Sequence, residues 1–167
     1  MKRVAYQLVI FLIAINGFVI AQNKLVKPQV KLNVNWAKYL AKHDLLWDEV
    51  PKDYFEGAFV GNGLLGTILF KDELDSNTLR FEIGRTDVYD HRTASPSAYE
   101  TSRLPIGQLL LKPLGVITHV KLRNDLWNAE IRGELTTTEG TISFRCFVPS
   151  AEELIVVNMK TTGKEQL

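Results

Sequence analysis

The stretch "GNGLLGTILFKDELDSNTLRFEI", from Gly61 to Ile83, decides between two folds. Its first six residues match the dinucleotide-binding fingerprint G-x-G-x-x-G, and Glu82 lies near the place of the ribose-binding acid, roughly 20 residues on. That site needs a helix beginning at the last glycine, because the pyrophosphate rests on the free N–H groups of the helix. The residues that follow Gly66 therefore decide whether the chain binds a dinucleotide.

Those residues predict a β-hairpin. Leu65–Phe70 is short, apolar and rich in strand formers, and the polar text "DELDSN" follows it too soon for a helix of about ten residues. Beyond that turn, Leu79, Phe81 and Ile83 alternate with polar residues, which is typical of a second strand. We conclude that the fingerprint match is accidental, and that the glycines provide a tight reversal with positive φ and a close backbone approach.

The second half of the chain continues the β pattern. Five further strands are predicted over Gly107–Leu111, Val116–Leu122, Ala129–Thr136, Thr141–Val148 and Leu154–Met159. In the fourth of these, Ile142, Phe144, Cys146 and Val148 share one face. Short strands with turn signals at near-regular intervals indicate an antiparallel sandwich.

Before the hairpin, a short helix is predicted behind the N-cap Asn35 and before Lys42, and Val50–Gly63 is predicted to be loop. The predicted fold class is all-β, an antiparallel β-sandwich of the supersandwich type with one short N-terminal helix. The last strand is followed only by "TTGKEQL", so we expect an exposed edge and an incomplete sandwich.

The N-terminus predicts export. Lys2 and Arg3 precede an apolar run from Val4 to Ala21, which is typical of a secretory signal peptide cut after Ala21. The alternative is an uncleaved membrane anchor, because a run of about 18 residues is near the spanning minimum. The predicted organisation is a signal peptide over residues 1–21, a linker over 22–34 and the sandwich domain over 35–167.

Composition limits the classes of partner. The chain is 46% apolar and 23% charged, as in one globular domain with a core. Lys2 and Arg3 are two of the 20 basic residues, so the chain without its signal has a formal charge near −1 against 19 acids. We therefore expect no nucleic-acid or anionic-membrane partner. Cys146, the only cysteine, excludes an internal disulfide and is predicted to be a buried, inert thiol.

The polar run "EIGRTDVYDHR", from Glu82 to Arg92, has the side chains that could act on a ligand. Three interpretations stay open. The residues can brace a long loop through Asp–Arg pairs, contact a sugar through charged planar and aromatic groups, or supply Glu82, Asp87 or Asp90 as the acids of a small hydrolase.

Other candidate residues have structural interpretations. His43, beside Asp44, and His119, predicted to be half-buried in a strand, give no metal signature, and no cofactor is expected. The turn that contains Asp72 and Asp75 is predicted to be solvated, with too few oxygen ligands for calcium. The three tryptophans, Trp36, Trp47 and Trp127, are predicted core anchors, and an exposed one would instead offer a sugar platform.

The order of these features resembles a known family. The runs "HDLLWDEVP", "EGAFVGNGLLGTILF" and "LRFEIGRTDVYDHR", then "RLPIGQLLL" and "TTTEGTISFRCFVPSAEELIVVNMKTT", are similar to the N-terminal β-sandwich of glycoside hydrolase family 95 and its alpha-L-fucosidase-like secreted relatives. Within that group the chain looks closest to the branch of domain of unknown function 5703. The resemblance covers Asp44 to Thr162.

The resemblance implies that this sandwich packs on an (α/α)6 barrel, which would hold the catalytic residues, so that this chain itself is truncated and carries none. The family's usual run after the hairpin is of the type N-E-x-x-W, whereas Gly84–Tyr89 reads "GRTDVY", so the resemblance does not extend to fucose specificity. By analogy, Asn62, Asp87, His91 and Arg92 are expected at a site edge or a domain interface. The expected partner is an oligosaccharide that is bound through the barrel.

Two rival functions stay open beside this expectation. The first is a free-standing, secreted carbohydrate-binding module, which would show an exposed tryptophan or tyrosine platform. The second is the small hydrolase with the acids named above. The family expectation differs from both, because it requires an apolar patch on the sandwich that is too large for a soluble monomer.

Overall fold

The computed structural model describes residues 32–90 and 102–166, and every element below lies in the compact unit Asn35–Leu167. The elements in chain order are α2 (Trp36–Leu40), β1 (Leu45–Trp47), the 3-10 turn η1 (Tyr54–Glu56), β2 (Ala58–Gly61), β3 (Leu65–Lys71), β4 (Leu79–Tyr89), β5 (Arg103–Leu111), β6 (Ile117–Asp125), β7 (Glu130–Thr137), β8 (Gly140–Phe147) and β9 (Val156–Gly163). The predicted helix after Asn35 is confirmed. Asn35 caps it by accepting the N–H of Lys38 at 3.0 Å.

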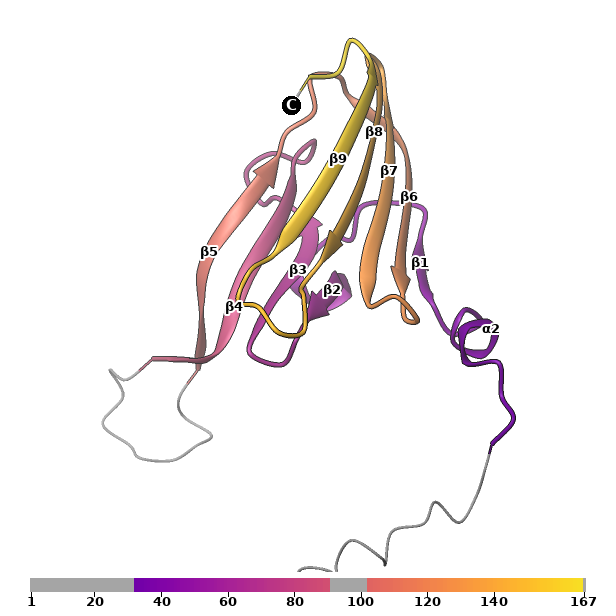
Figure 1. The fold of residues 1–167 in the computed structure, drawn as a ribbon. Coiled ribbons are helices and arrows are strands. Elements are labelled where there is room, and N and C mark those ends of the chain that lie inside the picture. Colours follow the sequence, from indigo (N-terminus) through magenta and orange to yellow (C-terminus); the bar gives the residue numbers. More distant parts are fainter. Residues whose placement is uncertain (1–31, 91–101, 167) are drawn as a thin grey trace, which may run out of the picture. The chain divides into compact units, whose positions relative to one another are not determined.

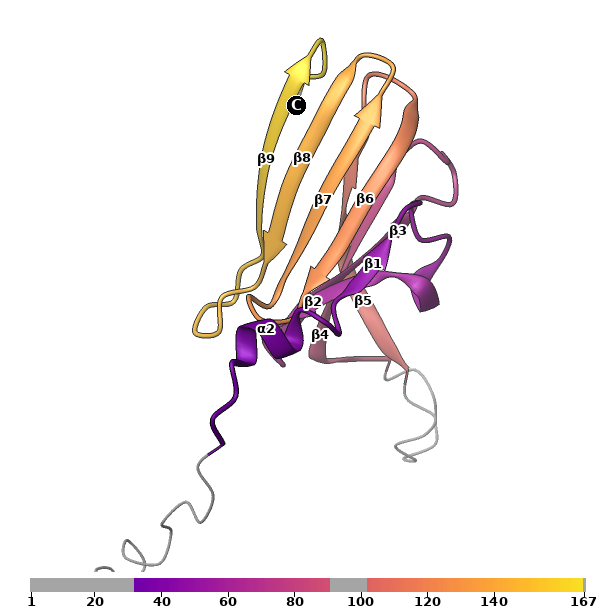
Figure 2. The same cartoon turned by 90° about the vertical axis from the view of Figure 1, so that its right-hand side faces the viewer.

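The strands form two antiparallel sheets packed as a sandwich, which confirms the predicted fold class. One sheet has the order β1-β6-β7-β8-β9, and the other has the order β2-β3-β4-β5. Figure 1 shows the two layers, and Figure 2 shows the strands of the five-stranded sheet side by side. Consecutive strands are mostly neighbours, as expected for chains joined by short turns.

The core lies between the inner faces of the two sheets. Phe81 of β4 and Phe144 of β8 meet edge to face with ring centroids 5.7 Å apart. Ile142, Phe144 and Cys146 are buried, so the predicted inward face of this strand is confirmed. Asn124 of β6 adds a polar link between the layers, because its amide donates to the carbonyl of Phe59 in β2 at 3.1 Å.

The glycine-rich stretch forms a hairpin turn between β2 and β3. Gly61 pairs with Gly66, and a Cβ on Gly66 would lie 3.0 Å from the carbonyl oxygen of Val60. Gly63 has a φ of +94°, a conformation that favours glycine. Gly66 lies within β3, so the predicted strand, and not a helix, runs on from the glycines. The predicted loop over Val50–Gly63 is wrong at its end, where β2 lies.

The hairpin of β3 and β4 is confirmed, with Ile68 opposite Glu82 and Leu69 opposite Phe81. β4 runs on to Tyr89, however, so it is longer than the predicted strand, whose alternation ends at Ile83, and most of the polar run from Glu82 is strand. Its pairing with β5 is shifted at Gly84 by an irregularity. A bulge of this kind re-aims the side chains that follow it.

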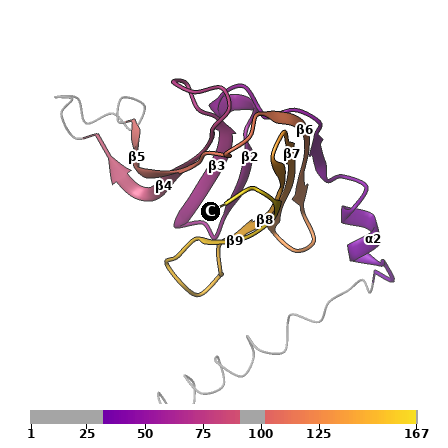
Figure 3. The same ribbon diagram turned by 90° about the horizontal axis from the view of Figure 1, so that it is seen from above.

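The two sheets are close at one side and apart at the other. Figures 1 and 3 show β5 lying away from β6–β9, while β2 and β3 lie alongside them. In the described part of the chain β5 and β9 are edge strands, each with one neighbour. The predicted exposed edge at β9 is confirmed.

The predicted signal peptide, its cleavage site and its alternative as an anchor lie outside the described residues, as does most of the predicted linker. Among the described helices, none is long and apolar enough to cross a membrane.

Candidate functional site

Asn62 is a predicted site residue that lies in the turn between β2 and β3. Its side-chain oxygen accepts the N–H groups of Leu64 and Leu65, at 3.0 and 2.9 Å. Its amide nitrogen donates to the carbonyls of Pro149 and Glu152, at 3.0 and 3.1 Å. Asn62 therefore shapes its own turn and also holds the β8–β9 loop of the other sheet.

Asp87, another predicted site residue, reaches the same loop through Arg85. Arg85 donates through Nε to Asp87 at 2.9 Å and through Nη1 to Glu153 of the β8–β9 loop at 2.6 Å. The hydrogen bond from Arg85 lowers the pKa of Asp87, and the same bond, with the one to Glu153, raises the pKa of Arg85. The structure thus brings Asn62 and Asp87 to one end of the sandwich, where Asp–Arg pairing braces the β8–β9 loop.

The remaining residues of the polar run have separate places. His91 and Arg92 lie outside the described residues. Glu82 is half-buried beside Arg80, at 4.0 Å, and Asp90 donates its backbone N–H to the carbonyl of Ser102 at 2.8 Å. The expectation that Asn62, Asp87, His91 and Arg92 border a site or an interface stays a prediction.

Several other sequence predictions are tested by burial. Trp47 packs on the core, but Trp36 and Trp127 are 45% and 53% exposed, so they do not anchor it. His119 is exposed and not half-buried. His43 contacts the ring of Tyr39, with centroids 5.0 Å apart.

Cys146 is buried, as predicted. Burial raises the pKa of its thiol to about 12, which keeps it protonated and unreactive at neutral pH.

The turn before β4 is a hydrogen-bonded structure and not a solvated one. Asp72 is buried, accepts the N–H groups of Leu74 and Asp75, and receives two bonds from Arg80, at 2.9 and 2.6 Å. The hydrogen bonds from Arg80 are the main reason that the pKa of Asp72 is lowered. Within residues 32–90 and 102–166, no group of three His, Cys, Asp or Glu residues is placed to hold a metal ion.

An arginine row that sequence reasoning missed crosses the outer face of the five-stranded sheet. Arg123 of β6 lies opposite Arg132 of β7, which lies opposite Arg145 of β8, which in turn faces Asn158 of β9. Alternation along each strand turns these side chains away from the core. We call these four residues the arginine row.

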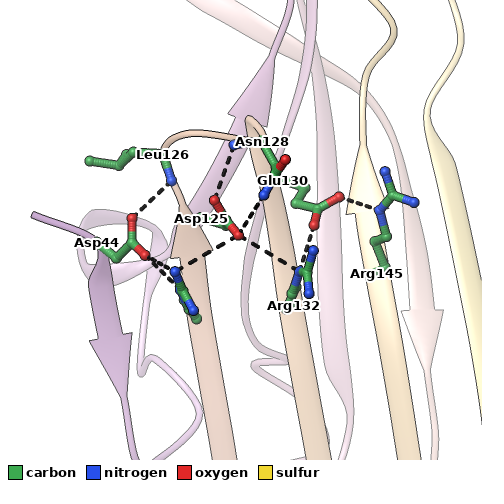
Figure 4. A network of polar contacts seen from close by, with 8 residues as sticks. Asp44, Asp125, Leu126, Asn128, Glu130, Arg132 and Arg145 are labelled. Atoms are coloured by element: carbon green, nitrogen blue, oxygen red, sulfur yellow. Dashed lines mark hydrogen bonds and ion pairs between the residues drawn. The ribbon is translucent and has the colours of Figure 1, made fainter. Parts of the chain in front are cut away.

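Buried carboxylates hold the three arginines from one end of the sheet, as Figure 4 shows for most of the residues involved. Glu130, whose side chain is fully buried, accepts from Nε of Arg132 at 2.5 Å and from Nε of Arg145. Asp44 accepts from Nε of Arg123 at 2.6 Å and from the N–H of Leu126 at 3.0 Å. Buried carboxylates need such partners, since an unpaired buried charge is strongly unfavourable.

Asp125 completes this network. Its carboxylate accepts the backbone and side-chain nitrogens of Asn128, at 3.0 and 2.9 Å, and lies 3.8 Å from both Arg123 and Arg132. Burial alone would raise the pKa of Asp125, but the Asn128 hydrogen bonds and the two guanidinium charges outweigh it and lower the pKa. The carboxylate therefore stays ionised beside the arginines.

The arginine row lies in a groove with a volume of about 880 Å³ on the outer face of this sheet. A second row next to it has Lys121, Glu134, Ser143 and Lys160 in register. The charged lining residues are Lys121, Arg123, Arg132, Glu134, Arg145 and Lys160. The groove thus exposes five cations and one carboxylate, an arrangement that can hold anionic or polyhydroxylated groups.

The edge strand β5 exposes apolar side chains on both of its faces. Leu109 is opposite Phe81, which is 1% exposed, yet Leu109 is 42% exposed because β5 lies one strand further from the core. Ile106 and Leu110 on the same strand are also exposed. We call Ile106, Leu109 and Leu110 the apolar edge.

Comparisons of the chain with protein-family models, with curated proteins and with solved structures found no match.

Proposed function

We propose that this chain is a non-catalytic β-sandwich of a secreted glycoside hydrolase-like protein of the family-95 type, and that the sandwich packs on an (α/α)6 catalytic barrel. The apolar edge carries this proposal. An edge strand with unpaired backbone groups and exposed Ile106, Leu109 and Leu110 is a site of aggregation unless it is covered. A neighbouring domain is the cover that the resemblance implies.

The acids of the polar run also favour a non-catalytic role. Asp87 is held in an ion pair by Arg85, and Glu82 lies beside Arg80. A glycosidase requires one carboxyl group with a raised pKa to protonate the leaving oxygen, whereas the pKa of Asp87 is lowered. These groups brace the sandwich instead.

The decisive experiment is to read the coding DNA beyond Leu167 and to assay the product of the whole frame on aryl glycosides. We expect an open frame that continues into a helix-rich segment, with activity that Glu82→Gln, Asp87→Asn and Asp90→Asn leave unchanged. A stop codon directly after Leu167 would contradict the proposal. Activity of the present chain alone that any of these three variants abolishes would favour the small hydrolase.

A free-standing carbohydrate-binding module is the second candidate, and one observation favours it. Trp127, in the β6–β7 turn, is 53% exposed and offers a ring on which a sugar can stack. Retention of the chain on immobilised neutral glycans, lost in Trp127→Ala, would support this candidate. Equal retention of both forms would argue against it.

A further inference from the structure

We propose that the groove over the arginine row binds an anionic oligosaccharide, that is, one that carries carboxylate or sulfate groups. The groove lies on the outer face of the five-stranded sheet, whereas the apolar edge belongs to β5 of the other sheet. The proposal therefore goes beyond the packing role above and does not depend on it.

The arginines are preorganised for a ligand. Arg132 and Arg145 both reach Glu130 through Nε, so one buried carboxylate fixes the direction of two guanidinium groups. Their side chains remain 56% and 53% exposed, and Arg123, held by Asp44, remains 42% exposed. The terminal nitrogens of these groups can then form bidentate bonds with a carboxylate or sulfate without loss of side-chain freedom.

Phe147 adds rigidity to the row. The guanidinium carbon of Arg145 lies 4.5 Å from the centre of the Phe147 ring, which is a cation–π contact. This ring and Glu130 hold Arg145 from two sides. A flexible surface arginine would lose more side-chain entropy when it binds a ligand. Arg145 is already fixed, so it loses less.

The charge at the surface favours an anion. Five cations and one carboxylate line the groove, whereas the acids that offset them, Asp44, Asp125 and Glu130, have side chains that are almost fully buried. A ligand approaching from solvent therefore meets the positive groups first. Adjacent strands are roughly 4.8 Å apart, a spacing comparable with the length of one pyranose ring, so successive sugars can face successive strands.

The neutral groups of the groove favour a saccharide over other polyanions. Ser143 and Asn158 offer a hydroxyl and an amide, which suit sugar hydroxyl groups. An acidic peptide would find no free sheet edge over β6–β8, where both sides of each strand are paired. An oligonucleotide would need rings on which its bases can stack. Of the two aromatic side chains that line the groove, Phe144 is buried and Trp47 is partly buried against the core, with its indole N–H bonded to the carbonyl of Glu56.

The test is calorimetric titration of the full chain with five probes of equal length: tetragalacturonate, a sulfated galactan tetramer, a neutral galactan tetramer, tetraglutamate and tetrathymidylate. We expect one or both anionic saccharides to bind, which identifies carboxylate or sulfate as the group recognised. The neutral tetramer should bind about tenfold more weakly, and binding should weaken with added salt. Failure of both anionic saccharides, or equal binding of tetraglutamate or of a tetrathymidylate, would overturn the proposal.

Two variants locate the site. Lys121→Gln combined with Lys160→Gln removes exposed charges and leaves the buried pairs intact, and it should weaken binding about tenfold. The matched control is Lys52→Gln with Lys112→Gln, which removes the same charge outside the groove. Unchanged binding in the first variant, or an equal loss in the control, would show that the groove is not the site.

Arg145→Gln provides a second variant at the row itself. Glu130 keeps Arg132 as a partner, and an unchanged thermal melt would confirm that the variant is folded. In that folded variant we expect a loss of affinity for the anionic tetramer, with no change for the neutral one. Equal affinity of the wild type and the variant for the anionic tetramer would overturn the assignment.

Discussion

Gly133 is the residue that allows the aromatic contact in the core. It faces inward on β7 between Ile131 and Leu135, and the ring of Phe144 covers it from β8. A Cβ at this position would lie 2.2 Å from two atoms of that ring. The absence of a side chain thus lets Phe144 lie where it meets Phe81 of the other sheet.

Gly133→Ala should therefore destabilise the fold by about 1–3 kcal/mol, because an added methyl group overpacks a filled core. Urea unfolding followed by tryptophan fluorescence would measure this. The control is Gly107→Ala on β5, where a Cβ would meet nothing within 4 Å. Equal losses at the two positions would mean that strand propensity, and not the Phe144 ring, causes the effect.

Glu165 holds the segment after β9. Its buried carboxylate accepts the N–H groups of Leu114 and Gly115, both at 2.9 Å, and the hydroxyl of Thr137 at 2.5 Å. The Thr137 bond is the largest cause of its lowered pKa, against which burial acts. One side chain therefore joins the β5–β6 connection to the end of β7.

Glu165→Gln should cost about 2 kcal/mol at pH 7, the order of a lost hydrogen bond to a charged group. Because the pKa of Glu165 is lower in the folded chain than the ordinary value of 4.5, its contribution is full above that value and is lost as the pH falls through the folded pKa. Urea midpoints of both forms should thus approach each other as the pH falls below 4.5 and converge once it is below the folded pKa of Glu165. A difference that persists at low pH would contradict this account.

At the scale of elements, the β8–β9 loop is held to the opposite sheet by two side chains. Asn62 binds two of its carbonyls, and Arg85 binds Glu153. Both residues come from β2–β4, so this loop closes one end of the sandwich. These hydrogen bonds and this ion pair are polar and lie near solvent, so the loop is a region of low local stability.

Asn62→Ala should destabilise the chain by about 1–2 kcal/mol and should speed proteolytic cleavage within residues 149–155. The physical reason is the loss of bonds to both the turn and the loop. Limited proteolysis with mass spectrometry would locate the cut. Asn158→Ala, at an exposed position of β9, is the control, and faster cleavage there as well would remove the special role of Asn62.

Most strands could be predicted because each is a run of alternating or apolar residues between turn signals. β2 was missed since its four residues lie among glycines, and β1 since three residues are too few to show a period. The length of β4 was missed because its outer half is polar. That half extends beyond the core, where alternation with buried residues is lost.

The arginine row could not be predicted from composition, since Arg123, Arg132 and Arg145 are spread over three strands of a nearly neutral chain. Only the register brings them together. The alternation of side chains along each strand gives part of the answer, because each arginine is next to a residue that is buried in the core and so points outward. Asn62 was singled out from the sequence, but its bonds to Pro149 and Glu152 depend on tertiary structure.

At the scale of the whole molecule, the two sheets cover each other only in part. The apolar edge should make the isolated chain associate with itself. We expect Leu109→Gln with Leu110→Gln to shift it towards monomer in sedimentation experiments at unchanged fold. Leu74→Gln with Leu126→Gln changes two exposed leucines in turns and is the control. A wild-type chain that is monomeric at all concentrations would contradict the expectation.

The buried thiol of Cys146 can serve as a probe of how often the sandwich opens. As the only cysteine, buried on the inner face of β8 with the pKa of its thiol raised to about 12, it can react with a thiol reagent only when the two sheets separate. The labelling rate, read as a mass increase of the intact protein, therefore counts how often the sandwich opens. A ligand that binds in the groove and holds β6–β9 together should lower the labelling rate of Cys146. Binding can therefore be measured without a label on the ligand.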